Sequence, residues 1–488
     1  MKRELFVILL VAAVTRLLLL DARPVDFDES VHGWIALKSV LESQNYVYNP
    51  AYHGPFQYFI LATLFKVIGD SDLSLRLPAA MFSILGVLAA LSLRRWIGYA
   101  AYIFAFFILF SPSILYYSRY ARNDLIVLSS FLLVLYFYLK YRDEGKILYA
   151  LLATIFLAVI FTSKENWIEY IPMFLVFIPV YSYYSQRSFR SLVTKKNLTA
   201  IAVGAITFTA IASFLYSSSF VYLLGGGKDT AGQDALKDAL NALLSIEWVK
   251  HYFNVSLSYW LSNSLPFGGE KAHFHPIWYY LSILLKYEFL ALGMAFASLP
   301  YLRRKAKSLS FIEALSVFWL ITAVLFYHAM AYKTPWLVAH LVAPIAFFGS
   351  VFAGRELFDE EKEAFRLAFV FLSFITVLLS IHLSFVDYND AAGEDIVYVQ
   401  TQPEGVELAK RIEELVHDGK RVLVYVPENY YWPLPWMLRH ENVAFTGEKC
   451  LLGLDYVFTS AKEECEKLGY YPVRDYEMRV GFHIWEMR

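Results

Sequence analysis

The sequence predicts an α-helical membrane protein that crosses the bilayer many times and carries a small α/β domain at its C-terminal end. Two features of composition point to this class: 58% of the 488 residues are hydrophobic, and only 18% are charged. Soluble globular chains have about 45–50% apolar and about 25% charged residues. The apolar residues also occur in blocks, which excludes an intrinsically disordered chain. A formal net charge of −1 gives no sign of a nucleic-acid partner.

Eleven stretches are long and apolar enough to cross a membrane, which takes about 20 mostly apolar residues. They are approximately 4–20, 75–93, 97–117, 124–140, 147–163, 168–184, 198–217, 277–300, 311–328, 334–353 and 366–386. The first follows Lys2 and Arg3, as a signal peptide would. It lacks a small-residue cleavage site, so we expect it to be retained.

Basic residues predict the orientation, because loops rich in Lys and Arg stay in the cytoplasm. With a cytoplasmic N-terminus, the inner connections hold Arg94, Arg95, Lys140, Arg142, Lys146, Arg187, Arg190, Lys195, Lys196, Arg303, Arg304, Lys305, Lys307, Arg355, Lys362 and Arg366. The short outer loops hold few basic residues: Arg119, Arg122, Lys164 and Lys333. An odd number of crossings then places the C-terminal region outside the cytoplasm. We therefore expect an integral protein of the cell membrane with an extracytoplasmic C-terminal domain.

We divide the chain into a membrane domain over 1–388 and a soluble domain over 389–488. The membrane domain has two large outer loops, at about 21–74 and 218–276. In the first, an apolar stretch near 56–69 is too short to span, so we expect a juxtamembrane helix. The second contains a run of glycines at 225–227 and an expected amphipathic helix near 233–262.

The C-terminal hundred residues alternate between helical and strand patterns. We expect a helix over 404–415, buried strands over 421–426 and 454–458, and a helix that continues through Cys465. This alternation is typical of a small α/β domain. Both cysteines, Cys450 and Cys465, lie here. A disulfide in an oxidising exterior and two unpaired buried thiols both agree with the sequence.

The first outer loop opens with the acidic motif Asp26-Phe27-Asp28-Glu29, followed by His32. Charges at the membrane rim are costly unless they have a function. A carboxylate in a partly desolvated pocket can act as a general base. The alternative is that Asp28 and Glu29 only begin a helix over 30–41.

Four further outer positions carry candidate residues. His53, in Tyr52-His53-Gly54-Pro55, can donate to a phosphate or bind a metal, or it can cap a turn. Arg119 and Arg122 beside Asp124 can clamp a phosphate and supply an acid for an acceptor or a metal, or they can form a helix start with snorkelling arginines. Lys164 and Lys333 extend the pattern. Each is an ordinary interfacial anchor alone, but together on one face they indicate a site.

Two other groups of residues have side chains that can bind a ligand or a surface. His273 and His275 with Glu270 resemble a metal site, although His-x-His spacing is common by chance. The aromatic segment 427–436 can stack on sugars or dock on the membrane, and we favour docking. The sequence contains no P-loop, GxGxxG motif or nucleophilic serine elbow, which argues against a nucleotide-driven transporter.

The order of these motifs resembles that of the GT-C superfamily of membrane glycosyltransferases. The acidic pair after the first span, the His-x-Pro of 53–55, Arg76-Leu77-Pro78, the Arg119–Asp124 corner and the late Lys333-x-Pro-Trp carry the resemblance. The chain is most similar to the protein O-mannosyltransferase and lipid A aminoarabinose transferase branch (glycosyltransferase family 39-like). Within it, Asp26–Gly33 and the Trp-Pro-Leu-Pro-Trp motif of the tail match a mainly archaeal, flippase-activity-associated group connected with protein glycosylation.

The resemblance covers residues 1–350 well, whereas the tail matches only the narrower group. It implies a GT-C fold with juxtamembrane helices in the first outer loop. One departure concerns His53: the family often has His-Pro-Pro where this chain has His-Gly-Pro.

The implied reaction moves one sugar from a polyprenyl- or dolichyl-phosphate donor to an extracytoplasmic protein, glycan or lipid acceptor. Asp28 matches the catalytic acid and Glu29 its partner, and we expect Asp28 to deprotonate the acceptor so that transfer inverts the anomeric carbon. The donor phosphate is assigned to Arg119, Arg122, Lys164, Lys333 and His53, and the acceptor or a metal to Asp124, Asp26 and His32. The family is divided on metal use, and the sequence agrees both with a reaction that needs a divalent Mg, Mn or Zn ion and with one that needs no cofactor.

Two alternatives to a glycosyltransferase also agree with the sequence. One is a lipid-linked sugar flippase or transport-associated component, which should show charges deep in the bilayer, broken helices and internal repeats. Here the expected spans are nearly free of charge, which favours an enzyme. The other is a degenerate scaffold that recruits a partner through its tail, against which the intact acidic and basic motifs argue.

Overall fold

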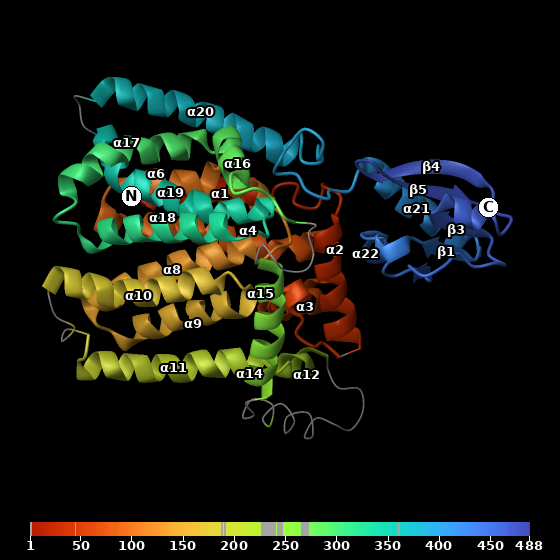
Figure 1. The fold of residues 1–488 in the computed structure, drawn as a ribbon, viewed down its shortest axis with the longest axis horizontal. Coiled ribbons are helices and arrows are strands. Elements are labelled where there is room, and N and C mark those ends of the chain that lie inside the picture. Colours follow the sequence, from red (N-terminus) through yellow and green to blue (C-terminus); the bar gives the residue numbers. More distant parts are fainter. Residues whose placement is uncertain are drawn as a thin grey trace.

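The computed structural model describes residues 2–43, 45–186, 189, 192–225, 241, 247–264, 273–358 and 362–488. The chain begins in a large helical body and ends in a smaller region built around a β-sheet, and these lie at opposite ends of the longest axis (Figure 1).

Six segments of the described chain are long and apolar enough to cross a membrane, judged by length and composition. They are α4 (Asp72–Ser92) continued by α5 (Arg94–Ile97), α8 (Asp124–Glu144), α11 (Lys195–Tyr216), α18 (Phe311–Ala329), Pro335–Leu357 with α19 (Val338–Phe352) at its centre, and α20 (Glu363–Phe385). Two bent pairs bring the number to eight if each pair is one span. They are α6 (Ala100–Phe110) with α7 (Pro112–Ser118), bent by 56°, and α16 (Tyr279–Tyr287) with α17 (Phe289–Lys305), bent by 99°.

The structure therefore supports six to eight spans in place of the eleven expected. The three remaining windows are helical, but α1 (Lys2–Leu17) and α9 (Ile147–Ser163) have only 16 and 17 residues. The third, α10 (Trp167–Gln186), is a continuous helix that contains Pro172 and Pro179 and carries Glu169. The 56° bend between α6 and α7 lies at Pro112, which has no N–H and cannot continue the hydrogen-bond ladder of the preceding helix.

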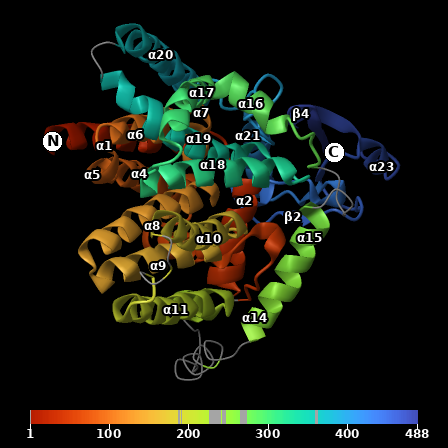
Figure 2. The same cartoon turned by 60° about the vertical axis from the view of Figure 1, so that its left-hand side comes forward.

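Helix α19 forms the centre of the helical body. Its spanning window is fully buried, whereas those of α11 and α20 are only 28% and 17% buried. In agreement with this, α20 and α11 lie at opposite edges in both views (Figures 1 and 2). A helix that is apolar all round belongs in a core, and α19 packs against α6, α8, α17 and α18.

The two large outer loops contain short helices. In the first, α2 (Phe27–Trp34) runs directly into the π-helical turn η1 (Ile35–Glu42), and α3 (Pro55–Ile68) is the short helix expected near 56–69. The second contains α12 (Ser219–Gly225), α14 (Glu247–Tyr252), η3 (Phe253–Leu257) and α15 (Ser258–Ser264). The expected amphipathic helix is thus helical from 247 onward, and nearly all of its earlier part lies outside the described residues.

The C-terminal region contains a mixed five-stranded sheet in the order β2-β1-β3-β5-β4. Its elements are α21 (Pro403–His417), β1 (Val422–Tyr425), α22 (Leu434–Met437), β2 (Ala444–Thr446), β3 (Tyr456–Thr459), α23 (Lys462–Glu466), β4 (Pro472–Arg479) and β5 (Phe482–Met487). Strand β1 is parallel to β2 and β3, with Leu423 opposite Ala444 and Val457, whereas β5 is antiparallel to β3 and β4. Both expected helices and both expected strands are confirmed, and β2, β4 and β5 were not predicted.

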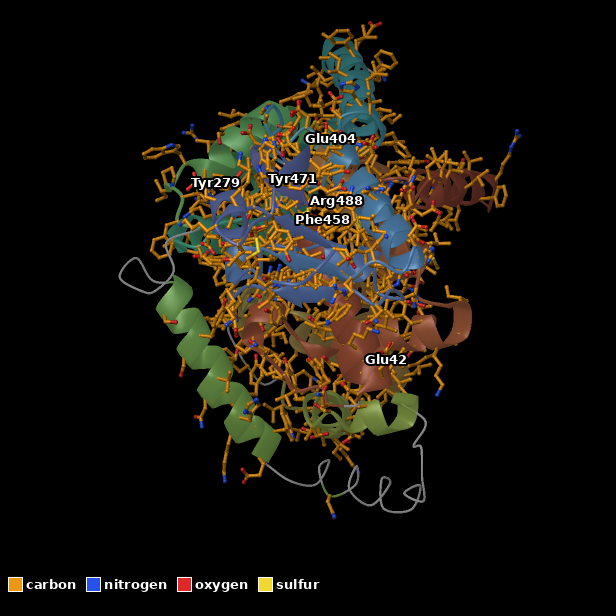
Figure 3. The ribbon with its side chains drawn as sticks, turned by 90° about the vertical axis from the view of Figure 1, so that its right-hand side faces the viewer. Glu42, Tyr279, Glu404, Phe458, Tyr471 and Arg488 are labelled. Carbon is orange, nitrogen blue, oxygen red and sulfur yellow. A yellow bond between two sulfur atoms is a disulfide. The ribbon has the colours of Figure 1, made fainter. Side chains whose placement is uncertain are left out.

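The sheet packs on both faces. On one face, Leu408 and Ile412 of α21 join the apolar cluster that contains Val424 and Phe458. On the other, Cys450 and Cys465 are joined by a disulfide, with their Cα atoms 5.6 Å apart. Figure 3 looks onto this end of the molecule, with Phe458 and the terminal Arg488 near the front. The boundary at 388/389 stays a prediction.

Candidate active site

Asp28 lies in the first turn of α2, and its side chain is 29% exposed although the neighbouring carboxylates are fully buried. The helix starts at Asp26, whose Oδ1 accepts the Glu29 N–H at 2.7 Å, while Glu29 Oε2 accepts the Asp26 N–H at 3.4 Å. This reciprocal capping box fixes the start of the helix. Burial raises the pKa of Asp26 well above its usual range, and within the described part of the chain its Oδ2 has no hydrogen-bond partner. The acidic motif is therefore both a helix start and a source of one accessible carboxylate.

Glu29 is held from several sides. Arg76 donates to both of its oxygens, from Nε to Oε1 at 2.8 Å and from Nη2 to Oε2 at 2.7 Å. Arg23 lies 3.3 Å from Oε1, and the backbone N–H of Ala121 donates to Oε1 at 2.7 Å. Burial alone would raise the pKa of Glu29, but the charges of Arg76 and Arg23 outweigh it and lower the pKa to about 2. Glu29 is therefore ionised at neutral pH, and its ion pairs hold the first turn of α2, next to Asp28.

A continuous chain of charges runs inward from Asp28. Arg122 Nη1 donates to Asp28 Oδ2, and Arg122 Nε lies 3.6 Å from Asp124 Oδ2. Lys164 Nζ donates to Asp124 Oδ1 at 2.8 Å. The Arg122 guanidinium also lies over the ring of Trp336, 3.6 Å from its centroid. The structure therefore brings together four of the predicted site residues: Asp28, Arg122, Asp124 and Lys164.

His340 also contacts this chain and was not predicted. Its Nε2 lies 3.1 Å from Asp124 Oδ1, and its Nδ1 lies 2.6 Å from the Tyr170 hydroxyl. An ionisable residue inside an apolar span is a functional candidate by default. That signal was present in the sequence at position 340.

His53 contacts Glu165, which was not among the predicted site residues. His53 Nδ1 lies 3.0 Å from Glu165 Oε2, and the Tyr48 hydroxyl donates to Glu165 Oε1 at 2.9 Å. The next residue explains the departure from His-Pro-Pro. The Gly54 N–H donates to Ser163 O at 2.9 Å, and a Cβ at Gly54 would collide with the backbone oxygen of Thr162. Proline lacks this N–H and carries a Cβ, so glycine is required here.

His32 is a buried neutral imidazole. Tyr58 donates its hydroxyl proton to Tyr52 O at 2.6 Å, so it accepts from His32 Nδ1 at 2.8 Å. Burial lowers the pKa of His32 well below its usual range, and the charge of Arg122 adds to the effect. The Nδ1–H tautomer follows from this arrangement, which leaves Nε2 as the basic nitrogen.

A cavity of about 230 Å³ lies beside the charged chain. Its lining residues are His53, Lys164, Glu165, Asn166, Ile168, Trp260, Phe326, Tyr327, Met330, Tyr332, Trp336 and Leu337. Lys164 and Glu165 make part of the wall ionic, whereas Ile168 and Phe326 make another part apolar. The cavity suits a ligand with an anionic head and a hydrocarbon tail.

Two predicted cations are engaged elsewhere. Arg119 donates to the carbonyl oxygens of Thr15, Arg16 and Leu19 at 3.0, 3.2 and 2.8 Å, and so caps the end of α1. Lys333 Nζ donates to the carbonyl oxygen of Met330, next to the cavity. Arg119 therefore serves the helical body, and Lys333 lies at the border of the cavity.

The predicted metal group of His273, His275 and Glu270 stays a prediction, because one of its three members lies outside the described residues. His273 Nδ1 lies 3.1 Å from the Tyr398 hydroxyl, and the His275 ring stacks on Tyr279 with centroids 4.2 Å apart. Glu270 lies outside the described residues. Among the described residues, three such groups come close enough to share an ion only at Glu413, His417 and Glu441, in the C-terminal region. Asp26, His32 and Asp124 do not form such a group.

Part of the chain matches a protein family model. The family model for dolichyl-phosphate-mannose-protein mannosyltransferase matches residues 52–216, about a third of the chain. This segment includes His53, Arg122, Asp124 and Lys164, and Asp28 precedes it. No curated protein matches the chain.

Solved structures match over nearly the whole length. ArnT from Cupriavidus metallidurans in the apo state has 14% identity and a TM-score of 0.64, with 99% of this chain and 98% of ArnT covered. The fold is that of ArnT. The same ArnT bound to undecaprenyl phosphate gives a TM-score of 0.65 at 14% identity over the same shares. The Archaeoglobus fulgidus oligosaccharyltransferase, solved with Zn and sulfate, gives 0.54 at 15% identity, covering 93% of this chain and 67% of its own. The ArnT match includes the C-terminal region as well as the helical body.

Proposed function

We propose that this integral membrane protein is a glycosyltransferase that moves one sugar from a polyprenyl- or dolichyl-phosphate donor to an acceptor on the extracytoplasmic face. One observation carries the proposal: Asp28 is linked through Arg122 to a buried Asp124–Lys164 pair beside an amphiphilic cavity. The family model and the ArnT fold support it, as does the binding of undecaprenyl phosphate by ArnT itself.

The cavity matches the two halves of such a donor. Lys164 is 4% exposed and faces the cavity, where a phosphate would be desolvated and strongly held by a cation. Ile168 at the start of α10 is 39% exposed, so the apolar wall continues to the surface where a polyprenyl tail can enter lipid. In the structure Lys164 is already neutralised by Asp124, which prevents an unpaired buried charge before the donor arrives.

In the proposed reaction, Asp28 accepts the proton of the acceptor hydroxyl. The acceptor oxygen forms a bond to the anomeric carbon while the bond from that carbon to the phosphate oxygen breaks, so the configuration inverts. The leaving polyprenyl phosphate gains negative charge, which Arg122 and Lys164 stabilise. Removing one donor of this kind costs about 10²–10³-fold in kcat.

The other predicted residues take supporting roles in this proposal. Glu29 and Asp26 fix the start of α2, since the oxygens of Glu29 and one oxygen of Asp26 are engaged there. The single proton of the incoming hydroxyl goes to Asp28, and a role for His32 toward the acceptor or a metal stays a prediction.

The orientation follows the basic loops: we place the N-terminus in the cytoplasm and the C-terminal region outside. The narrower similarity to the archaeal flippase-associated group rests on the Asp26–Gly33 and Trp-Pro-Leu-Pro-Trp motifs. A flippase remains the second candidate, because Asp124, Lys164 and His340 are buried charged or ionisable groups of the kind that transporters use.

A reconstitution experiment separates the two candidates. Purified protein in liposomes is given a panel of radiolabelled polyprenyl-phosphate sugars with saccharide, peptide and lipid acceptors. We expect the labelled sugar to appear on one acceptor, with one polyprenyl phosphate released for each transfer. Lipid that crosses the bilayer with its sugar still attached would support the flippase and contradict the enzyme.

A further inference from the structure

The aromatic segment of the tail is built into protein. Trp436 of α22, expected at the membrane surface, is fully buried, and its Nε1 donates to Asp72 Oδ1 at 2.8 Å. Its ring lies 5.6 Å from that of Phe65 on α3. A Cβ at Gly33 would come within 2.7 Å of two atoms of this ring, so the indole packs directly against the backbone of α2. Trp436 therefore wedges the C-terminal region against α2, α3 and α4.

Arg479, at the end of β4, makes a second contact with α2. Its two Nη atoms donate to Trp432 O at 2.6 Å and Tyr430 O at 3.1 Å. Its guanidinium lies 5.3 Å from the ring centroid of Phe27, the residue directly before Asp28. Tyr430 touches the same phenylalanine, with ring centroids 6.2 Å apart. Arg479 thus organises a cap over the first turn of α2.

Further contacts hold the chain leading into the helix. Gln400 Nε2 donates to Pro24 O at 2.7 Å, and Thr401 Oγ1 donates to Val25 O at 2.6 Å. In Figure 1, α2 lies at the junction, with α22 and the sheet beside it. The outer side of α2 is therefore covered by the C-terminal region, while Glu29 ties its inner side to Arg76.

We propose that the C-terminal region is a positioning element of the active site, which holds α2 through Trp436 and Arg479 so that Asp28 meets Arg122. This inference rests on the function proposed above. Helix α2 continues into η1, and helices of this length take most of their stability from tertiary packing. A misplacement of about 1 Å in a reacting group can cost about 10²-fold in rate. Neither Trp436 nor Arg479 contacts the cavity, so both act through α2.

The test uses matched variants of the full-length protein. Arg479→Met removes the cap over Phe27, and Arg474→Met is its control on the same strand, since the Arg474 side chain pairs with the exposed Glu407 and lies over the Tyr476 ring. Gly33→Ala pushes α2 from Trp436, and Gly293→Ala is its control, because nothing lies within 4 Å of a Cβ at Gly293.

We expect Arg479→Met and Gly33→Ala to lower kcat by about 10–100-fold with the donor KM nearly unchanged, and Arg479→Lys to recover part of the rate. The two controls should behave as the wild type. An unchanged kcat in both test variants would overturn the proposal. So would a parallel loss of donor binding and thermal stability, because that pattern means a structural role alone.

A readout without catalysis separates this proposal from the proposed function. Amide hydrogen exchange over residues 27–34 should speed up in Arg479→Met and in Trp436→Phe, but not in Arg474→Met. If the wild type transfers no sugar while exchange changes as expected, the proposed function fails and the positioning contact stands. Unchanged exchange in both variants of an active enzyme contradicts the positioning role.

Discussion

Arg76 and Glu29 form a bidentate ion pair in which both side chains are fully shielded from solvent. The pair joins α4 to α2. Removing Arg76 leaves the buried Glu29 with the longer contact to Arg23, and breaking a buried ion pair costs up to about 3–5 kcal/mol. We therefore expect Arg76→Met to lower the free energy of unfolding by this amount, measured by thermal or denaturant unfolding in detergent. The double variant Arg76→Met/Glu29→Leu should regain part of the loss, and an unaltered single variant would contradict the pairing.

Stability should fall below about pH 6.5 because two buried histidines resist protonation. Burial lowers the pKa of both His32 and His53 from the usual 6.5, with nearby cations adding to the effect. Below pH 6.5 the unfolded chain therefore binds more protons than the folded one, and the folded state loses stability as pH falls toward the lowered values. The melting temperature measured between pH 7.5 and 5 should show this slope. His32→Gln should make it shallower, whereas an equal slope in the variant would exclude His32 as its source.

Lys164 and Arg119 should separate catalysis from stability. Lys164→Met is expected to reduce kcat by about 10²–10³-fold, because it removes a cation that faces the leaving phosphate. Arg119→Met should leave the kinetics of the folded fraction unchanged and lower the unfolding free energy by about 1.5–3 kcal/mol, since it removes charged hydrogen bonds to the end of α1. Steady-state kinetics and thermal unfolding of both variants check this. A selective rise in donor KM in Arg119→Met would return Arg119 to the phosphate site.

Gly54 should tolerate no side chain. Gly54→Ala forces a Cβ against the Thr162 carbonyl, and Gly54→Pro also removes the N–H bonded to Ser163. We expect both to lower thermal stability, with the proline variant lower, because His53 and α3 must shift. Gly293→Ala is the control and should change little, because a Cβ at this helical glycine meets no described atom within 4 Å and its φ is not positive. Wild-type stability in Gly54→Pro would show that this close approach is not a constraint.

Much of the fold could be predicted from apolar stretches, but their number could not be converted into spans. Every expected window is helical, because about 20 apolar residues favour a helix in any setting. The bend at Pro112 comes from the proline, which a hydropathy average does not register, and the short lengths of α1 and α9 depend on where the chain leaves each helix. Hydropathy alone does not contain that information.

The candidate site was predicted by residue type and membrane side, and geometry then sorted the residues. Arg119 and Arg122 look equivalent in sequence, yet one caps α1 and the other pairs with Asp28. Glu29 looks like a second catalytic acid in the sequence, yet in the structure its carboxylate is held in a buried ion pair with Arg76. The partners that decide these roles lie in other elements, Arg76 in α4 for Glu29 and Leu19 after α1 for Arg119, so no local pattern reveals the pairing.

The transfer assay with Asp28→Asn tests the central claim most directly. The substitution keeps size and hydrogen bonding but removes the proton acceptor, and a general base contributes about 10²–10⁴-fold. We predict that transfer from the polyprenyl-phosphate sugar falls by that factor, while thermal stability and donor binding stay at wild-type levels. Transfer by Asp28→Asn at the wild-type rate would contradict the account.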